Sequence, residues 1–347
     1  MDSLKASVRR RALELGFVLC GFTSAAPPEQ YPRFREWIAA DLHAGMDYLA
    51  DERSLTLRAD PYRLLPATRS IIALAVAHPP PPAAGNFPLE GRVAAYALGE
   101  DYHEVIRARL RTLCEYIGRL AGRRVQSRGY VDTAPFLERE FASRAGLGWI
   151  GRNSMLIHPE FGSFLLLAEI LTELDLPPDP PFSADRCGTC VRCRQACPTG
   201  CILPDRTIDS RRCISYLTIE HRSPIPESLR SSIGRAVFGC DICQTVCPWN
   251  RKAPPAADAA FSARAHFPIR DMGREFLLPE EEWKERFRRS PIRRTGREGY
   301  RRNLLIALGN TCREEAVPVL EAGTQDPDPV LKACAEWALK QIRGKKG

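Results

Sequence analysis

Eight of the thirteen cysteines in this 347-residue chain lie between Cys187 and Cys247, and their spacing suits iron–sulfur chemistry. The first run, C-x2-C-x2-C-x3-C-P, comprises Cys187, Cys190, Cys193 and Cys197 and ends at a proline. In bacterial ferredoxins the first three cysteines of this run hold one 4Fe–4S cluster, and the fourth binds the other cluster. A tight turn points three thiolates at one face of the cube, and the proline then directs the chain away.

The second run, C-x2-C-x3-C-P, is one cysteine shorter and comprises Cys240, Cys243 and Cys247. The isolated Cys213 completes the set of eight. Reciprocal crossing of the two runs then predicts two clusters with four ligands each. The first cluster takes Cys187, Cys190, Cys193 and Cys247, and the second takes Cys197, Cys213, Cys240 and Cys243.

Structural zinc is the alternative for a cysteine-rich segment. Zinc sites usually pair two cysteines with two more, and they rarely show two x3-C-P endings, so the spacing favours iron and sulfur. Cys201 lies near the second cluster, but no ligand position is left for it. The five remaining cysteines are interpreted as small apolar residues: Cys20, Cys114, Cys201, Cys312 and Cys334.

The region ahead of the clusters must supply the substrate site, because such clusters transfer electrons one at a time and do little substrate chemistry themselves. Residues 1–176 are expected to form an α/β or α+β domain. Apolar spacing predicts helices at residues 4–15 and 102–120, and apolar runs predict strands at 70–76 and 163–171. Neither common type of glycine-rich nucleotide-binding loop is present.

The rest of the chain divides into two further regions. Residues 177–252 begin with the stiff linker PPDPP and are expected to form a bacterial-type two-cluster ferredoxin domain. Residues 253–347 are expected to be an all-α HEAT-like repeat, with helices at 300–308, 314–322 and 330–342. The first of these helices should end at a Gly-Asn pair. A plain helical cap on the core is the alternative.

A basic tract at residues 284–302 carries nine cations against two glutamates. The cations are Lys284, Arg286, Arg288, Arg289, Arg293, Arg294, Arg297, Arg301 and Arg302. Such a tract would make salt-dependent contacts with RNA phosphates. A solvated charged face is the alternative.

Whole-chain composition is that of a soluble globular protein, with 44% hydrophobic residues, 27% charged residues and a net charge of +8. No apolar run approaches the ~20 residues that span a bilayer. The basic N-terminus lacks the long apolar segment of an export signal. The sequence therefore predicts a cytoplasmic protein with no membrane contact, and nothing in it demands a partner subunit, so a monomer is expected.

Four further stretches give the chain a family resemblance. They are YALGEDYH at residues 96–103, VDTAP at 131–135, GLGWIGRN at 146–153 and CISYLTIE at 213–220. Together with the double cluster run and the helical tail, they make essentially the whole chain resemble epoxyqueuosine reductase, a cobalamin-dependent iron–sulfur enzyme of queuosine biosynthesis.

The resemblance implies the last step of queuosine synthesis, in which the epoxide oxygen is removed from epoxyqueuosine at the wobble position of a tRNA. The implied cofactors are two 4Fe–4S clusters and cobalamin, with cobalamin between the N-terminal domain and the clusters. The implied partners are the tRNA anticodon stem-loop, contacted by the helical tail, and an external electron donor. The D-x-H-x-x-G cobalamin motif is absent, as in a family whose cobalt has no protein histidine ligand.

The resemblance assigns Asp132 as the proton donor, because epoxide opening leaves an alkoxide-like oxygen that a positioned acid can protonate. Burial against the corrin is expected to raise the pKa of Asp132 so that it is protonated near neutral pH. The alternative role is the N-cap of a following helix.

The cofactor and nucleoside pocket is expected to include Asp132 together with residues from each matching stretch and from upstream. These are Arg58, Tyr96, Ala97, Tyr102, His103, Gly148, Trp149, Arg152, Asn153, Ser154, Ser215 and Glu220. Relatives usually have Lys at the position of Arg152, so a role that needs a compact ammonium is in doubt there. Cys201 also departs from the family, since a smaller residue is expected at that position.

Two other functions compete with this one. A corrinoid reductive dehalogenase would share the cofactors but would usually carry a twin-arginine signal and lack a helical tail. A simple iron–sulfur electron carrier would not need the long region ahead of its clusters.

Overall fold

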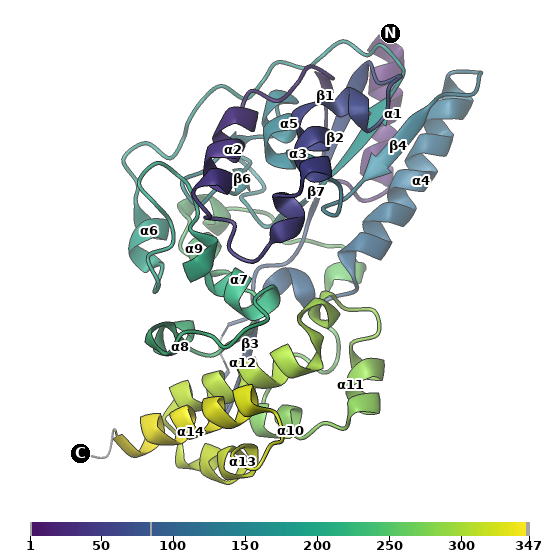
Figure 1. The fold of residues 1–347 in the computed structure, drawn as a ribbon. Coiled ribbons are helices and arrows are strands. Elements are labelled where there is room, and N and C mark those ends of the chain that lie inside the picture. The colour runs from purple at the N-terminus through teal and green to yellow at the C-terminus, as the bar shows by residue number, and fades with distance from the viewer. Residues whose placement is uncertain (1, 84, 345–347) are drawn as a thin grey trace.

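A four-stranded sheet lies at one end of the molecule and a group of helices at the other in the computed structural model, which describes residues 2–83 and 85–344 (Figure 1). The strand order is β1 (Leu19–Ser24), β2 (Ser70–Ala77), β7 (Leu165–Thr172) and β4 (Ser127–Tyr130). All neighbouring strands are antiparallel. The N-terminal region is therefore α+β, the second of the two expected alternatives.

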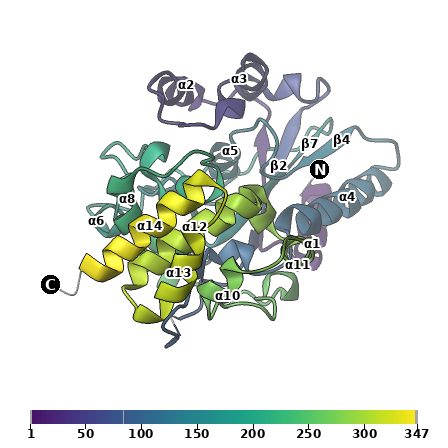
Figure 2. The ribbon, with the colours of Figure 1, turned by 60° about the horizontal axis from the view of Figure 1, so that its bottom comes forward.

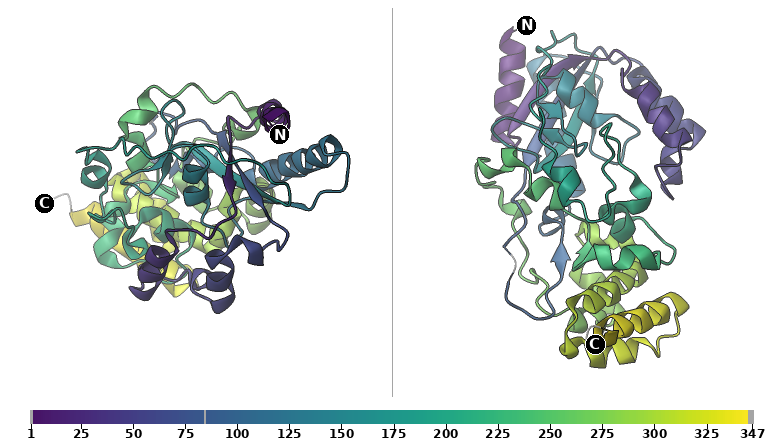
Figure 3. Two further views of the ribbon diagram at one scale, coloured as in Figure 1. Left: turned by 90° about the horizontal axis from the view of Figure 1, so that it is seen from above. Right: turned by 90° about the vertical axis from the view of Figure 1, so that its left-hand side faces the viewer.

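Helices cover both faces of this sheet, which explains why β2 is an uninterrupted apolar run. Successive side chains of a strand point to opposite faces. Ile72 and Leu74 pack toward α1 (Asp2–Glu14) and α4 (Tyr102–Leu120), whereas Ala73 and Ala75 pack toward α5 (Glu138–Arg144). Seen from the side, the molecule is elongated, with its N-terminus and C-terminus at opposite ends (Figure 3).

The excursion between β1 and β2 connects the sheet to the cysteine-rich segment. It contains α2 (Tyr31–Ala39), the 3-10 turn η1 (Asp47–Leu49) and α3 (Glu52–Ala59). Trp37 Nε1 donates to Ile208 O at 2.7 Å, and the Gly45 amide donates to the Tyr216 hydroxyl at 2.9 Å. These bonds hold the excursion against the region that contains the clusters.

The cysteine-rich segment contains short elements only, because it has to turn repeatedly around its cysteines. Its helices are α6 (Arg192–Ala196), α7 (Ile214–Ile219), α8 (Glu227–Ile233) and α9 (Ile242–Thr245). Strand β8 (Ala236–Phe238) pairs in parallel with β3 (Arg92–Val93), and β5 (Trp149–Ile150) pairs with β6 (Leu156–Ile157).

The C-terminal region is helical, with α12, α13 and α14 layered over one another (Figure 2). Its helices are α10 (Met272–Phe276), α11 (Glu280–Arg286), α12 (Gly296–Thr311), α13 (Val317–Gly323) and α14 (Pro329–Gly344). The expected helix end at Gly309 is wrong, because α12 continues through it. A Cβ on Gly309 would lie 2.7 Å from the Ala338 Cα, so the glycine serves close helix packing.

One apolar core crosses the expected boundary at residues 252 and 253. It includes Val93 and Phe238 together with Leu304, Leu320 and Trp337 from the tail. The domain limits 1–176, 177–252 and 253–347 stay predictions. Within the described part of the chain, no helix is long and apolar enough to cross a membrane.

Candidate active site

Each cysteine run is built in the same way, as a short helix that ends just before the last cysteine and its proline. Helix α6 precedes Cys197, and α9 precedes Cys247 after a single further residue. The two helices pack on each other. Cys247 then caps a 3-10 turn that has Pro248 in its first position. This packing brings the two runs face to face.

The thiols fall into two neighbouring groups. Burial raises the pKa of the Cys247 thiol, and the charges of Cys187, Cys193 and Cys190 raise it further. Burial also raises the pKa of the Cys240 thiol to about 12, with a further rise from Cys213 and Cys197. Cys243 has its pKa raised by burial and then by Cys240, Cys213 and Cys193, although the crossed assignment places Cys193 on the other cluster. Most of these neighbours follow the crossed assignment, which stays a prediction.

Cys201 lies inside the second group although no ligand position is assigned to it. Its Sγ is 3.4 Å from the Cys197 Sγ, and its side chain is buried. A buried position explains why the residue is small and apolar in character.

The stretch from Gly148 to Ser154 lies against the first thiol group. Trp149 is buried, and its Nε1 donates to the Cys187 Sγ at 3.4 Å. A Cβ on Gly148 would lie 2.2 Å from the Ile157 carbonyl oxygen, so only glycine permits this approach. Ser154 donates to the Arg206 carbonyl at 2.6 Å.

Arg152 and Asn153 present buried nitrogens that lack a hydrogen-bond partner among the described residues. These are Arg152 Nε and Asn153 Nδ2, although Arg152 also donates to the Gly188 carbonyl at 2.8 Å. Buried polar atoms normally have partners, so an unpartnered donor pair indicates a place where a ligand supplies the acceptors.

Asp132 lies in a loop after β4, at the first turn of α4. Its Oδ2 accepts a hydrogen bond from the Tyr102 hydroxyl at 2.5 Å and lies 3.2 Å from His103 Nε2. His103 Nδ1 lies 2.7 Å from Asp101 Oδ1, the group that also caps α4. The rings of Tyr102 and His103 stack with centroids 4.0 Å apart. The result is a hydrogen-bonded chain Asp101–His103–Asp132.

Without the corrin, the protein's own groups shift the pKa of Asp132 downward, so the rise expected from burial against the corrin stays a prediction. Burial acts to raise the pKa of Asp132, but the hydrogen bonds from His103 and Tyr102 together lower it by more, and the net shift is downward. The carboxyl side chain is 57% exposed, so the hydrogen bonds have the greater effect. Burial lowers the pKa of His103, but its bonds to Asp101 and Asp132 raise it to about 9. The proton therefore resides on His103 at neutral pH.

The N-cap alternative for Asp132 is also wrong. Helix α5 begins at Glu138, and its N-cap residue is Leu137. Asp132 has φ of +50°, a left-handed conformation that is uncommon for residues other than glycine. The backbone amide of Asp132 donates to Glu138 Oε1 at 2.6 Å, and this bond ties the loop to the start of α5.

A second buried carboxyl lies near this loop. Glu169 on β7 is fully buried, and neither carboxyl oxygen has a hydrogen-bond partner in the described part of the chain. Burial raises its pKa well above the usual range, with additional contributions from Glu138 and Asp132. Burial likewise raises the pKa of Glu138 to about 8. Both carboxyls are therefore neutral near pH 7.

The remaining expected contacts of the N-terminal domain are Tyr96, Ala97 and Arg58. Tyr96 packs edge-on against Tyr102, with centroids 5.8 Å apart. Ala97 is fully buried, so neither its side chain nor its backbone is exposed in this structure. Arg58 is buried at the end of α3, with its guanidinium 5.6 Å from the Phe34 ring.

Glu220 joins the site to the basic tract, and Ser215 lies one turn earlier on α7, partly buried. Arg294 forms an ion pair with Glu220, and its guanidinium lies 5.5 Å from the Tyr48 ring centroid. The charge of Arg294 also lowers the pKa of Asp132, after the hydrogen bonds described above. Residues from η1, α7 and the tract therefore meet beside Asp132.

Most of the tract cations, Arg294 included, form ion pairs with carboxylates. Ion pairs form for Lys284, Arg286, Arg288, Arg289, Arg294, Arg297 and Arg301. Arg302 is buried and donates to the carbonyls of His221, Ser223 and Leu217. The tract therefore carries much less unpaired charge than its sequence suggests.

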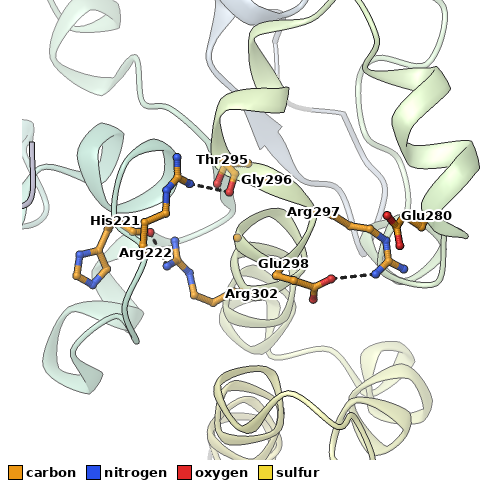
Figure 4. Close-up of a pocket in the computed structure, with 9 residues that line it drawn as sticks. His221, Arg222, Glu280, Thr295, Gly296, Arg297, Glu298 and Arg302 are labelled. Carbon is orange, nitrogen blue, oxygen red and sulfur yellow. Dashed lines mark hydrogen bonds and ion pairs between the residues drawn. The ribbon is translucent and has the colours of Figure 1, made fainter. Parts of the chain in front are cut away.

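A cavity of about 400 Å³ lies on the tract side of the molecule (Figure 4). Arg222 and Arg302 line one side, and Arg297 lies on the other with Glu298 and Glu280. Three arginines face two glutamates, so the lining is nearly neutral. It contains none of the residues expected to bind substrate or cofactor.

Sequence reasoning missed Asp101, Glu138, Glu169 and Tyr48. A signal existed for Glu169, because a carboxylate inside the apolar run LLLAEILT is costly unless it has a function. Asp101 directly precedes a predicted helix, which marks it as an N-cap. No local pattern distinguishes Tyr48 or Glu138.

Two family models match parts of the chain. One, described as "Epoxyqueuosine reductase QueG, DUF1730", matches residues 58–133. The other, described as "4Fe-4S double cluster binding domain", matches residues 186–250. Residues 186–250 are thus a segment that binds two 4Fe–4S clusters.

Comparisons over nearly the full length of the chain lead to the same family as the first family model. An epoxyqueuosine reductase of Escherichia coli (strain K12) is 38% identical over 345 residues, which cover 98% of this chain and 90% of the relative. A crystal structure of epoxyqueuosine reductase with an epoxyqueuosine-modified tRNA-Tyr stem loop has a TM-score of 0.90 at 30% identity, covering 98% and 90%. The Bacillus subtilis epoxyqueuosine reductase, with its catalytic aspartate loop swung out of the active site, has a TM-score of 0.89 at 30% identity, covering 98% and 91%.

Proposed function

This chain belongs to the epoxyqueuosine reductase family, and from that premise we propose that it reduces epoxyqueuosine to queuosine at the wobble position of tRNA. The observation that carries the proposal is the position of Asp132. Its carboxyl lies in a hydrogen-bonded chain with Tyr102 and His103, in the same molecule as a double-cluster segment. The chain is therefore an oxidoreductase.

The reaction fixes what the site must deliver. Removing the epoxide oxygen breaks two C–O bonds and forms one C=C bond, and the oxygen leaves as water. The balance requires two electrons and two protons. The clusters pass single electrons, which an external donor has to supply.

Asp132 and His103 are suited to the proton part of this balance. His103 is protonated at neutral pH and lies 3.2 Å from Asp132 Oδ2. A proton can move from His103 Nε2 to Asp132 and from there to the leaving oxygen. Asp101 then stabilises the position of the ring through Nδ1. In this path Asp132 receives its proton from His103 and does not have to be protonated beforehand.

The residues of the site fit cobalamin. The corrin carries amide side chains, and the unpartnered Arg152 Nε and Asn153 Nδ2 offer donors to amide oxygens. Trp149 connects this stretch to Cys187. Bound there, cobalamin would supply a metal centre that accepts single electrons and reacts at a carbon–oxygen bond.

The broader expectations belong to the same proposal. We place the reaction in the cytoplasm, where tRNA is found, and we expect a monomer.

The HEAT-like character of residues 253–347 is supported by the stacked helices α12, α13 and α14. RNA contact by the tract is supported mainly by Arg293, whose printed partner is the Arg288 backbone carbonyl, since the other tract cations, Arg294 included, are paired with carboxylates or buried.

The test is turnover of a modified anticodon stem-loop by the purified, cluster- and cobalamin-loaded protein. The wild-type protein should form queuosine. Asp132→Asn should keep both clusters and bound cobalamin but lose roughly a hundredfold or more in rate, as expected for loss of a general acid. A wild-type protein that leaves the epoxide intact under reducing conditions would disprove the function. An active Asp132→Asn would disprove only the role of Asp132.

A further inference from the structure

Tyr48 is an exposed aromatic ring at the edge of the Asp132 site. It lies on η1, and 48% of its surface is exposed. Burial of its hydroxyl raises the pKa of Tyr48, and the charges of Glu220 and Asp132 contribute to the rise while Arg294 opposes it. The charge of Asp132, the group that is proposed to transfer the proton, thus acts on Tyr48.

Arg294 covers this ring and is itself fixed in place. Its guanidinium is 5.5 Å from the Tyr48 centroid and forms an ion pair with Glu220. Its backbone carbonyl accepts a hydrogen bond from Arg222, which also donates to the Thr295 carbonyl at 2.7 Å. Two segments far apart in sequence thus build one stack, in which the guanidinium lies over the Tyr48 ring and about half of the tyrosine surface stays exposed.

This surface suits a flat neutral ring better than a phosphate. The charge of Arg294 is balanced by Glu220, and Asp132 adds negative charge nearby. Unpaired RNA bases are recognised by stacking on aromatic rings and on arginine guanidinium planes. The cavity of Figure 4 is a weaker candidate, because its arginines are opposed by Glu280 and Glu298 and Arg302 is taken up by backbone carbonyls.

We infer that Tyr48 and Arg294 form a stacking ledge for the unpaired anticodon base next to the modified nucleoside. The inference rests on the proposed function and adds a specificity-determining contact to it. A base held on this ledge would fix the neighbouring nucleoside over Asp132 while the stem lies elsewhere.

The test compares Tyr48→Leu with wild type on a modified anticodon stem-loop, using the loaded protein. The KM should rise about tenfold, the size of one lost stacking contact, with kcat within about twofold. Tyr48→Phe keeps the ring and should restore the wild-type KM. Tyr62→Leu is the matched control, since Tyr62 is 42% exposed and takes no part in the site, and it should leave KM unchanged.

A second readout does not depend on turnover. With 2-aminopurine beside the modified position, binding to wild type or Tyr48→Phe should quench the fluorescence, and binding to Tyr48→Leu should not. Unchanged KM and quenching in Tyr48→Leu would overturn the ledge, and so would loss of bound cobalamin in that variant, because the ring would then serve the cofactor. Inactive wild-type protein would instead remove the proposed function.

Discussion

The chemistry of this molecule is concentrated in a hydrogen-bonded chain of three side chains. Asp101 caps α4 and also fixes the ring of His103, so one carboxylate both starts the helix and orients the imidazole. His103 in turn lies between two acidic groups, which keeps its proton bound well above the usual pKa of histidine. The proposed acid of the site is therefore the pair of His103 and Asp132 rather than a single carboxyl.

The pH dependence of the chemical step should follow His103. Its pKa is raised to about 9, so the proton is present below that pH and is lost as pH rises through it. The single-turnover rate of wild type should therefore fall only above about pH 9. In His103→Gln, Asp132 must hold the proton itself, and the fall should move to a pH at least one unit lower, about 8 or below.

Asp101→Asn gives the graded comparison for this prediction. It removes the negative charge of Asp101, one of the two carboxylates that raise the pKa of His103, so its pH profile should lie between those of wild type and His103→Gln. Identical profiles for all three proteins would show that His103 holds no catalytic proton.

At the level of elements, close packing decides where helices end. Helix α12 runs through Gly309 because the glycine allows the backbone of α14 to approach. In the Asp132 loop, the bond from its amide to Glu138 at the start of α5 holds a left-handed backbone in place. Both are local conformations selected by a neighbouring element.

Gly309→Ala should destabilise the protein. The new Cβ would lie 2.7 Å from the Ala338 Cα, and overpacking of this kind costs roughly 1–3 kcal/mol. The melting temperature should fall by several degrees, measured by thermal unfolding of the loaded protein.

Gly118→Ala is the matched control for this substitution. Gly118 lies inside α4, where the nearest atom to a new Cβ is the Arg123 carbonyl oxygen at 4.0 Å. Helix propensity alone should raise the stability of this variant by up to about 1 kcal/mol. A Gly309→Ala protein as stable as Gly118→Ala would contradict the packing argument.

The whole molecule brings together segments that are distant in sequence. Tyr48, Asp132, Glu220 and Arg294 come from four separate regions and meet at one site. The apolar core shared by the cluster segment and the tail fixes the segments that carry Glu220 and Arg294 relative to each other. Substrate, proton donor and electron source can therefore lie within one rigid assembly.

Crossed ligation of the clusters is a prediction that depends on this tertiary arrangement. Cys213→Ser should reduce iron from about eight to about four per polypeptide in anaerobically purified protein. Cys201→Ser should retain about eight, although its sulfur lies 3.4 Å from that of Cys197. Full iron content in Cys213→Ser, or loss of a cluster in Cys201→Ser, would contradict the assignment.

Much of the fold followed from local patterns. The predicted helix at residues 102–120 has the observed bounds, and the predicted strand at 70–76 is one residue shorter than β2. These elements have strong apolar periodicity or a continuous apolar run. The strand order and the antiparallel pairing had no local signal, because they depend on contacts between distant segments.

The sequence alone determined the family and a segment for two clusters, and it predicted the eight ligands and Asp132 as the group of interest, because spacing and motifs are local properties. Only the tertiary structure decided the protonation of the site. The pKa of Asp132 depends on His103 and Tyr102, and that of His103 on Asp101 as well, through distances set by α4 and the β4 loop. It also decided that Tyr48 meets Arg294, since charge and stacking act through space rather than along the chain.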